Sequence, residues 1–599
     1  MTGHFEESRM NQSKANIKLL SRTMFRLLPM QILMALVGGA NGFVSSYFAS
    51  NFISVDAVGV MGLYGPVSML VGAVSMMLVG GAVILCGRYI GENRQEKSRN
   101  VFTLSLTVSA LTALLFTALF VVLGAFDLTG FLARDPSMRP LFNRFLLGQA
   151  VGVLPLLIGN QLFAFLSLEN KTGWSILSSA SFLGANIVLS FLFVCVFKMR
   201  EFGLALAASL GTWVYCGVEA MHFLSGKSHF RFAAGALDWK ETTSIVRIGF
   251  PGALSNGYQT IRGYAVNAMI LACIGSAGIS AFAASDNLLK LFWAIPSAMM
   301  AVSRMMLSVS VGEEDRESLQ DTMRVMFRRF LPLMCCVSAM IILFAVPLTR
   351  IYYKDSSDPV FRMTVSALRI LPLCMPLSVI CMHFVCYGQI TGKKALVHIL
   401  SVLDGVLCVA GFTALLIHRM GMNSVYVANV LNGVVTTLVI FIYSMLMKKR
   451  FPRNIDDLMV IPEGFGAPQS ERMDLSVRDM KEVVEISRRV QDFCLKKGVD
   501  RRRAYLAGLA MEEMAGNVVD HGFTKDRKRH TVDIRVARKN ESVILRIKDD
   551  CVPFDPSERS RIADSGDPAA NIGIRMVFKT AESVQYQNIL GMNVLTIRI

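Results

Sequence analysis

The sequence predicts an all-α polytopic membrane protein of about twelve transmembrane helices in two six-helix lobes, followed by a C-terminal α+β domain. The first observation is hydrophobicity: 53% of the 599 residues are hydrophobic and the mean hydropathy is +0.47. The second is charge. Residues 1–454 hold 37 Lys and Arg against 21 Asp and Glu, whereas residues 455–599 hold 24 against 23. Because a soluble domain is about one quarter charged, the first part is predicted to lie in lipid and the tail in water.

Apolar runs of roughly 20 residues suit a bilayer core about 30 Å thick. After an N-terminal segment, residues 1–24, such runs lie near 25–50, 58–86, 101–125, 141–167, 173–197, 201–224, 246–274, 279–310, 328–349, 363–388, 395–418 and 422–447. The N-terminal segment lacks a cleavable signal pattern, so the first run is expected to act as the insertion signal. The 12 Cys show no metal-ligand spacing, and most lie in apolar runs, so neither a metal site nor a disulfide is expected.

Basic residues gather in alternate loops between these runs. With the N-terminus inside, the cytoplasmic segments hold roughly two dozen Lys and Arg, against about nine in the outer loops. Because an even number of spans returns the chain to its starting side, both termini are predicted in the cytoplasm and the protein in the cell (inner) membrane. The net charge of +17 then follows from membrane topology, and no nucleic-acid partner is expected.

The apolar runs repeat along the chain. "RLLP" (Arg26–Pro29) opens the first half and "RIGFP" (Arg247–Pro251) the second. "GENRQEKS" (Gly91–Ser98) and "GEEDRESL" (Gly312–Leu319) follow at matching positions, with the same offset of 221 residues. Internal repeats of this kind are typical of transporters, which bind substrate between the two halves and rock around it. A channel or a receptor is the alternative interpretation.

The repeat and the composition divide the chain into units. The N-lobe covers 25–224 and the C-lobe 246–448, joined by a basic cytoplasmic linker, 225–245. A second linker, 449–472, contains "PEGFGAPQ" and leads to the α+β domain at 473–599.

Stretches in both halves resemble the multidrug and toxic compound extrusion (MATE) family. They are "DAVGVMGLYGPVSMLVGAVSMMLVGGAVILCGRYIGENRQEKSRNVF", "GANIVLSFLFV", "EFGLALAASLGTW" and "IVRIGFPGALSNG". The resemblance covers about residues 15–448. It implies a twelve-helix, two-lobed antiporter in the lipid bilayer that exports small, amphipathic or drug-like molecules by alternating access, driven by Na⁺ or H⁺.

The resemblance also implies acids in the N-lobe that this sequence lacks. Many family members carry an Asp in the first span, where this chain has Asn41. Another often follows "NIVL", where this chain has Ser190. An N-lobe protonation switch is therefore not expected at these positions, whereas Na⁺ coordination by neutral oxygens remains open.

Three acids lie well inside the predicted spans, where an unpaired carboxylate costs several kcal/mol unless a proton or Na⁺ relieves it. Asp286 has Lys290 four residues on, along the same helix face. The preceding span carries a polar stripe of Asn256, Gln259, Arg262 and Asn267. One interpretation is that Asp286 binds the coupling ion or the substrate, together with Arg262, Lys290 and Asn256. The other is that Asp286 forms a purely structural ion pair with Arg262 or Lys290.

The other two acids are Asp404 and Glu219. Asp404 has no basic partner in its own span, which leaves titration and a structural role equally open. Glu219 lies toward the cytoplasmic end of its span, so snorkelling toward water is the favoured interpretation and a functional role is the alternative. Met-rich stretches such as "SAMMAVSRMM" (Ser297–Met306) fit packing better than ligand binding.

The tail alternates helix and strand patterns. A helix pattern covers "SVRDMKEVVEISRRVQDFCLKKG" and a second runs over about 501–521; strands follow at "TVDIRVAR" and "SVILRIKDD", a helix starts near Gly573, and strands "SVQYQ" and "NVLTIRI" close the chain. On the second helix, Glu513, Asn517 and His521 fall at i, i+4 and i+8, along one helix face.

This ladder is followed by "KDDCVPFDP", "NIGIRMV" and "GMNVLTIRI". In this order the motifs resemble the ATP-binding domain of anti-sigma-factor serine kinases, a histidine-kinase-like ATPase sandwich. The resemblance implies ATP and Mg²⁺ as cofactors. Asn517 would bind Mg²⁺, Glu513 would be the catalytic base, Asp549 would bind the adenine amino group, and Gly573 would lie in the phosphate lid.

The tail departs from the family pattern at two positions. Cys551 replaces the glycine of Asp-x-Gly, and Asn571 replaces the first glycine of the lid. The tail is therefore expected to be an ATP-binding regulatory domain of the exporter, with kinase activity left open. One alternative is a membrane sensor whose tail is a serine/threonine kinase acting on a partner protein. A second is a flippase for lipid-linked precursors.

Overall fold

The structure is a computed structural model that describes the chain except for residues 1, 93, 134–135, 227, 234–236, 351–355, 524–531, 540–541, 554 and 558–571. Six long helical segments form the N-lobe. They are α1 (Thr2–Phe48), extended by the π-helix η1 (Ala49–Ile53), α2 (Val55–Gly91), α3 (Gln95–Ala125), α4 (Arg139–Leu168), α5 (Thr172–Ser190), extended by the π-helix η3 (Phe191–Val196), and α6 (Arg200–Leu224). The short 3₁₀ helix η2 (Thr129–Phe131) precedes α4.

The C-lobe repeats this arrangement with more interruptions. Its segments are α7 (Lys240–Cys273), α8 (Ser276–Gly312), α9 (Arg316–Val325) with η5 (Met326–Phe330), α10 (Leu331–Leu343) and α11 (Ala345–Thr349), α12 (Pro359–Ile370) with η6 (Leu371–Leu373) and α13 (Cys374–Thr391), α14 (Lys394–Val402) with η7 (Leu403–Leu407) and α15 (Cys408–Met420), and α16 (Asn423–Lys448). Because α7 begins at Lys240, the end of the predicted linker 225–245 is helical.

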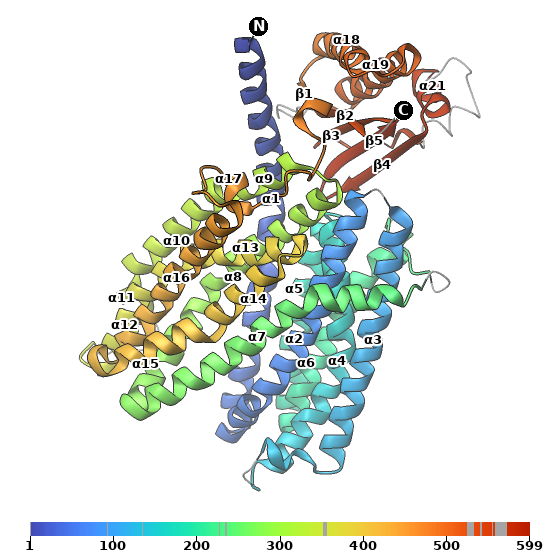
Figure 1. Ribbon diagram of the computed structural model, residues 1–599. Helices are drawn as coiled ribbons and strands as arrows, with labels where there is room; N and C mark the ends of the chain where they lie inside the picture. The colour runs from blue at the N-terminus through green and yellow to red at the C-terminus, as the bar shows by residue number, and fades with distance from the viewer. Residues whose placement is uncertain are drawn as a thin grey trace.

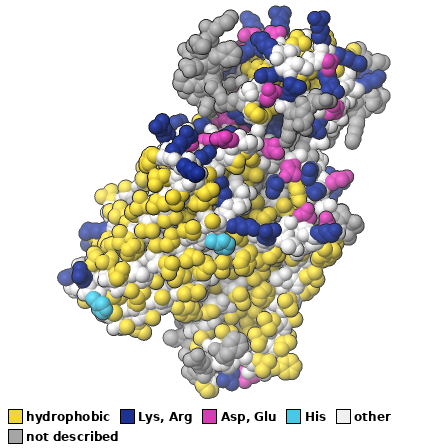
Figure 2. All heavy atoms as spheres, in the orientation of Figure 1, with side chains coloured by type: hydrophobic (Ala, Val, Ile, Leu, Met, Phe, Trp, Pro, Cys, Tyr) yellow, Lys and Arg dark blue, Asp and Glu magenta, His cyan; other side chains and the backbone are white. Residues whose placement is uncertain are grey.

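Eleven helical segments within the described residues are long and apolar enough to cross a membrane. The predicted span at 246–274 is absent from these eleven, although α7 has 34 residues. Its polar stripe, which includes Arg262, lowers its hydropathy. Figure 2 shows a broad hydrophobic surface over the helices, with charged side chains gathered around the tail. The chain is a multi-pass membrane protein.

The two lobes meet at the end nearest the tail and diverge at the opposite end (Figure 1). Glycines allow this contact. A Cβ atom at Gly312 of α8 would collide with the main-chain carbonyl of Arg88 on α2, and one at Gly91 would collide with that of Val309. Toward the other end of α2, a Cβ atom at Gly65 would meet nothing within 4 Å. The close contact between the main chains of the two lobes therefore lies at the tail end, which is closed.

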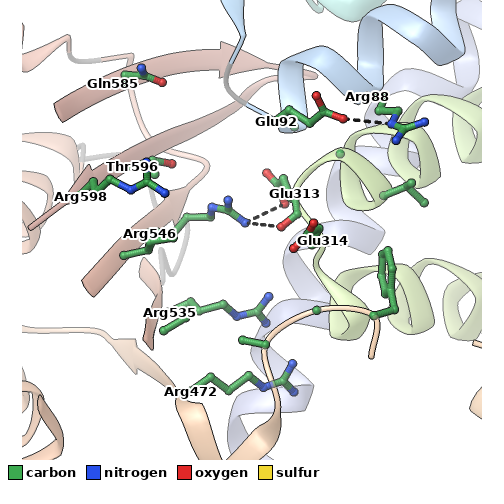
Figure 3. Close-up of a pocket in the computed structure, with 18 of the residues that line it drawn as sticks. Arg88, Glu92, Glu313, Glu314, Arg472, Arg535, Arg546, Gln585, Thr596 and Arg598 are labelled. Carbon is green, nitrogen blue, oxygen red and sulfur yellow. Dashed lines mark hydrogen bonds and ion pairs between the residues drawn. The ribbon is translucent and has the colours of Figure 1, made fainter. Parts of the chain in front are cut away.

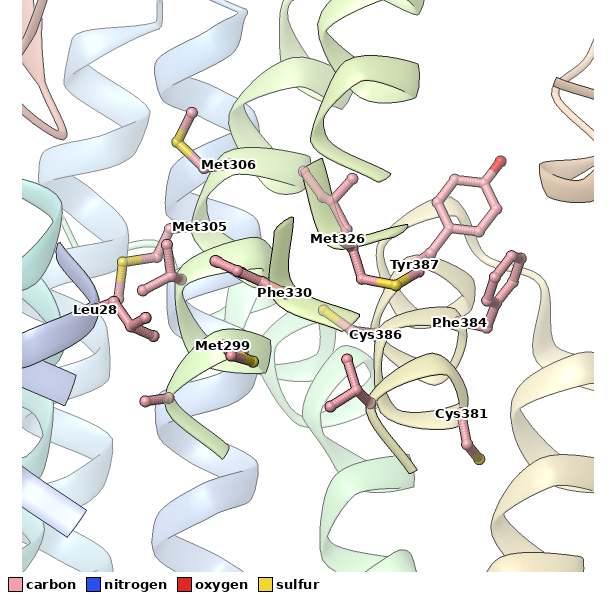
Figure 4. Close-up of a cluster of buried hydrophobic side chains, with 14 of the residues drawn as sticks. Leu28, Met299, Met305, Met306, Met326, Phe330, Cys381, Phe384, Cys386 and Tyr387 are labelled. Carbon is pink, nitrogen blue, oxygen red and sulfur yellow. The ribbon is translucent and has the colours of Figure 1, made fainter. Parts of the chain in front are cut away.

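Methionine fills much of the core beside this contact. Met299, Met305 and Met306 of α8 are buried in the same hydrophobic cluster as Met326 and Phe330 of η5, and Met305 extends toward Leu28 of α1 (Figure 4). Met adapts to irregular gaps between helices because its side chain is unbranched and flexible. The packing role predicted for the Met-rich stretch is confirmed.

The tail is a five-stranded antiparallel sheet with helices on one face. Its elements are β1 (Arg472–Val477), α18 (Met480–Lys496), α19 (Arg501–Asn517) with the π-helix η9 (Val518–Gly522), β2 (Val532–Lys539), β3 (Ser542–Asp549), α21 (Ile572–Thr580), β4 (Ser583–Ile589) and β5 (Met592–Arg598), with strand order β1-β2-β3-β5-β4. Asp479 and Asp500 cap α18 and α19 by accepting main-chain N–H groups. The sequence prediction missed β1, although Met473, Leu475 and Val477 alternate as in a strand.

Two further short elements precede this domain. The first, α17 (Ile455–Met459), packs against the C-lobe, where Arg316 forms a bidentate ion pair with Asp456 at 2.8 Å. The second, the 3₁₀ helix η8 (Gln469–Glu471), leads into β1. The predicted linker 449–472 therefore contains structure that holds the tail close to the membrane part.

One face of the tail sheet is apolar and packs on α18 and α19 through residues such as Ile534, Leu545 and Ile597. The opposite face is polar and faces the membrane part (Figure 1). Arg535 lies directly across from Arg546 in the β2–β3 register. Like charges opposite one another are unfavourable in a sheet, so this face needs acids from elsewhere.

Candidate functional site

The N-lobe positions that the sequence singled out form a neutral hydrogen-bond network. The amide nitrogen of Asn186 on α5 donates to the amide oxygen of Asn41 on α1. The hydroxyl of Ser190 donates to the amide oxygen of Asn186 at 3.3 Å. The structure thus joins Asn41 and Ser190 through a third residue, Asn186, which the sequence prediction did not single out.

Glu219 is fully buried, so the expectation that it snorkels is wrong. The Ser178 hydroxyl donates to its Oε1 at 3.2 Å, and its Oε2 has no hydrogen-bond partner among the described residues. One turn on, His222 contacts the buried Glu169 at 2.6 Å. α5 packs closely against α6 and covers the polar residues of this face, which is why Glu219 does not reach water.

Asp286 and Lys290 form an ion pair along α8, at 2.8 Å between Oδ2 and Nζ. Their side chains are 48% and 65% exposed. Asn256 on α7 instead reaches across to the N-lobe, where its amide nitrogen lies 3.2 Å from the sulfur of Met76. The charge of Asp286 is therefore balanced on its own helix.

Asp404 lies in the π-helical turn η7, within a membrane span. Its Oδ1 accepts a hydrogen bond from the Asn432 amide at 2.7 Å. The Arg262 guanidinium donates to the main-chain carbonyl of Asp404 at 3.0 Å, not to its carboxylate. Within the described residues, no cation forms an ion pair with this carboxylate. Among the described residues of the C-lobe, Asp404 thus has a cation at its main chain but no ion pair at its carboxylate, and it lies in a π-turn, a distortion frequent at functional sites.

In the tail, α19 ends at Asn517 and a π-helical turn follows. Glu513 and Asn517 share a face, and the Asn517 amide donates to the Glu513 main-chain carbonyl at 2.6 Å. The prediction that His521 continues this face assumed an unbroken α-helix and is corrected: His521 lies in the wider η9 turn and is exposed.

Asp549 lies buried at the end of β3. Its Oδ1 accepts from the Asn593 amide at 2.7 Å and from the Cys551 main-chain N–H at 2.9 Å. Burial raises the pKa of Asp549 above its usual value. The cavity beside it measures about 20 Å³, space for roughly one water molecule and not for an adenine ring. The side chain of Cys551 lies against Gly522, which is one of the residues that line this space.

Gly573 lies in the first turn of α21, directly against the Glu513 carboxylate, and any side chain at position 573 would collide with it. A helix N-terminus attracts anions through its free N–H groups and its dipole. The Glu513 carboxylate therefore lies beside the start of α21, near the place where the resemblance puts phosphate. Asn571 lies outside the described residues. The described residues of the tail do not accommodate a nucleotide as they are arranged here.

The fold and these sites define a two-lobed multi-pass membrane transporter that carries an α+β domain of the histidine-kinase-like ATPase type. Residues 30–192 and 251–415 match the model of the MatE family, and the chain belongs to this family. Residues 477–599 match the histidine kinase-like ATPase domain. No curated protein sequence gives a significant match.

Solved structures share the fold of the membrane part. One, titled an outward-facing conformation of a multidrug resistance MATE family transporter of the MOP superfamily, has a TM-score of 0.67 at 20% identity, over 75% of this chain and 99% of that one. A MATE in complex with MaD3S gives the same values. A MOP superfamily transporter from Pyrococcus furiosus, whose title reports a reversed polarity of the binding pocket, has a TM-score of 0.64 at 19% identity, over 72% and 96%.

Proposed function

We propose that the protein is a Na⁺- or H⁺-coupled antiporter that exports small, amphipathic or drug-like molecules by alternating access. Asp404 is the observation that carries this proposal. Its carboxylate lies within a membrane span, and its only described hydrogen-bond donor is Asn432. A carboxylate in such surroundings is costly when ionised and unneutralised, so binding of a proton or Na⁺ changes its energy strongly.

Asp404 also lies where its charge can affect the inter-lobe helix α7. Arg262 of α7 holds the main chain of the η7 turn, and Gly405 packs against the ring of Tyr258 on α7. A change of charge at Asp404 therefore acts on the turn to which α7 is attached. α7 in turn contacts α2 of the other lobe, at Asn256 and Met76.

Efflux from reconstituted vesicles tests this function. Transport of a fluorescent cationic dye is expected to require a Na⁺ or pH gradient and to continue without ATP. In Asp404→Asn, coupled transport should fall by about tenfold or more, equivalent to about 1.4 kcal/mol. Asp286→Asn is the comparison, with a smaller expected effect because Lys290 already balances Asp286. ATP-driven transport without a gradient, or full coupling in Asp404→Asn, would contradict the proposal.

We infer further that the tail regulates this transport from the cytoplasmic side. The positive residues that predict a cytoplasmic N-terminus place the tail on the same side. The tail contacts both lobes where they meet: Lys548 pairs with Glu313 of the C-lobe at 2.5 Å, and the Leu590 main-chain N–H donates to the Leu168 carbonyl of the N-lobe at 2.9 Å. Because the tail domain contacts both lobes at the end where they meet, it stabilises the conformation in which this end is closed.

Binding of ATP and Mg²⁺ by the tail, with Asn517 and Asp549 as contacts, would require Glu513 to leave α21 and the cavity at Asp549 to widen. In this arrangement α21 lies beside the Glu513 carboxylate and covers one side of it, which leaves less room for a partner protein. The kinase alternative therefore has less support than a regulatory role. Phosphorylation of a partner in lysate, lost in Glu513→Gln, would reverse this preference.

A further inference from the structure

A cavity of about 870 Å³ lies between the polar face of the tail sheet and the membrane part. We call it the junction cavity. Its walls come from four parts of the chain: the end of α2 and the α2–α3 turn with Arg88, Glu92 and Arg94, the α8–α9 turn with Glu313 and Glu314, the segment 464–467, and the sheet strands. Figure 3 shows the sheet side chains extending across this space toward the two turns. These turns are the repeated sequences "GENRQEKS" and "GEEDRESL" of the two lobes.

Guanidinium groups dominate the walls. Six arginines and three glutamates line the junction cavity: Arg88, Arg94, Arg472, Arg535, Arg546 and Arg598, with Glu92, Glu313 and Glu314. Four further acids lie behind this lining: Asp315, Glu317 and Asp474 bind Arg472 and Arg535, and Asp533 is buried near Arg535 and Lys548. The surface that faces the cavity therefore carries more positive than negative charge.

Three of these arginines have weak or shared partners. Arg88 and Arg94 both contact the same Glu92, at 3.0 and 3.4 Å, and Arg598 contacts Glu582 at 3.9 Å. Their side chains are 53%, 57% and 50% exposed. Exposed ion pairs of this kind are worth little, so an incoming anion can replace the carboxylates at small cost.

Unsatisfied polar atoms lie in the same walls. The Nε of Arg546 and the Oε1 of Gln585 are buried and have no hydrogen-bond partner among the described residues. The Nη1 of Arg546 donates to the Glu313 main-chain carbonyl at 3.4 Å and lies 3.6 Å from the Glu313 carboxylate. Thr596 lies directly across from both Arg546 and Gln585 in the sheet register and adds a hydroxyl to the lining. A side-chain adjustment around an anion would satisfy the N–H of Arg546 Nε, whereas the Gln585 Oε1 is an acceptor and would need a donor from the ligand or from water.

We propose that the junction cavity binds a phosphate-bearing polyanion. The planar guanidinium fork matches phosphate oxygens, and arginine is the residue that recognises phosphate through paired hydrogen bonds. The volume is within the range of small-molecule sites. The phosphate can belong to a soluble polyphosphate, such as a nucleotide, or to the headgroup of an anionic lipid.

Such a ligand would join the two lobes to the tail. Arg88 and Arg94 belong to the N-lobe, and Arg546 and Arg598 to the sheet, which Glu313 ties to the C-lobe. Occupancy would therefore strengthen the closed state at the tail end. This consequence rests on the proposed regulatory role of the tail, whereas binding itself does not.

Calorimetric titration of inorganic tripolyphosphate into the full chain, held in nanodiscs of zwitterionic lipid, tests the proposal. Wild type is expected to bind, with affinity that falls steeply as salt rises. The double variant Arg88→Gln/Arg598→Gln should lose at least about tenfold in affinity. Each charge-assisted hydrogen bond that is removed is worth about that much. Arg501→Gln/Arg502→Gln is the matched control. Its residues are exposed on α19, away from the cavity, and should leave affinity unchanged.

Two further arms identify the site and the ligand source. Asn517→Ala should retain binding; loss there would place the phosphate in the nucleotide site and overturn the proposal. Nanodiscs with anionic phospholipid should weaken tripolyphosphate binding to wild type if the ligand is a lipid headgroup, and leave it unchanged if it is soluble. Absence of tripolyphosphate binding to wild type in zwitterionic nanodiscs, or equal losses in the site and control variants, would also overturn the proposal.

Discussion

Arg535 of the tail sheet and Asp315 at the start of α9 form an ion pair between two domains, with both side chains largely buried. Asp315 also caps α9, because its Oδ1 accepts the Ser318 main-chain N–H at 2.9 Å. Lys548 approaches the other oxygen of Asp315 at 3.3 Å. This one carboxylate therefore joins a membrane helix to two strands of the tail.

Asp315→Asn should detach the tail from the C-lobe without unwinding α9. Asn is as good an N-cap as Asp, so the cap remains while the charge is lost. Breaking a buried ion pair by removing one partner costs about 3–5 kcal/mol, and Arg535 would be left with Asp474 and Glu317. Limited proteolysis of the segment before β1 should become markedly faster. Unchanged protection would show that Asp315 does not hold the tail.

Arg535 and Lys548 hold the pKa of Asp315 well below its usual range. A lowered folded-state pKa gives stability that is present above the unfolded value of about 3.9 and is lost as the pH falls through the folded value. This contact should thus persist throughout the range from about pH 5 to 8, and pH effects there must come from other groups.

Asp533 on β2 is such a group. Burial raises its pKa to about 7, against the opposing effect of Arg535. A raised folded-state pKa gives stability that is complete below about pH 4 and is lost as the pH rises through about 7. Wild type should therefore melt lower at pH 8 than at pH 5, and Asp533→Asn should reduce this difference by about 5 °C. Thermal unfolding of the detergent-solubilised chain at pH 5 and pH 8 measures this difference in wild type and in Asp533→Asn. The same difference in both proteins would show that another group causes the pH effect.

Gly312→Ala should impair closure at the tail end. In an ordinary helix this change is favourable by about 1 kcal/mol, but here the new methyl group would collide with the Arg88 carbonyl of the other lobe. Overpacking against a rigid backbone costs about 1–3 kcal/mol, so dye efflux should fall by about tenfold. Gly65→Ala, on open space in α2, is the control. Comparable efflux in both variants would mean that the α2–α8 contact does not limit transport.

Cys551→Gly should enlarge the cavity at Asp549. The Cys551 side chain lies against Gly522, which lines that cavity, so its removal adds space behind the lining and lets Gly522 shift outward. A fluorescent ATP analogue should then bind about tenfold more tightly, or about 1.4 kcal/mol, as followed by fluorescence anisotropy. Cys551→Ser preserves the size of the side chain and should bind no better than wild type. A gain in Cys551→Ser as large as in Cys551→Gly would show that cavity size is not the obstacle.

The membrane spans could be predicted because hydrophobic runs of bilayer length are a local property of the chain. The repeat of Gly91–Ser98 and Gly312–Leu319 likewise indicated two equivalent halves. The pairing of Asp286 with Lys290 followed from their spacing on one helix. Strand β1 was missed because six residues of alternation are a weak signal beside a long helix pattern.

The relation of Asp404 to Arg262, 142 residues apart, was beyond sequence reasoning, because no local pattern reports which atom of one residue faces another. The same holds for Glu219, whose burial depends on how α5 packs on α6. The π-turn after Asn517 also changed the expected alignment of His521, since one extra residue per turn is not readable from side-chain spacing.

The sequence by itself determined that this protein spans the membrane in two repeated lobes and ends in a histidine-kinase-like ATPase domain, since hydropathy, repeats and motifs are properties of neighbouring residues. Only the tertiary structure decided that the tail sheet docks its arginines on the turns between the lobes, and that Glu513 lies against Gly573 where a phosphate would bind. Both contacts join residues that are far apart in the chain. Their charges and their available space therefore depend on how whole helices and domains pack together.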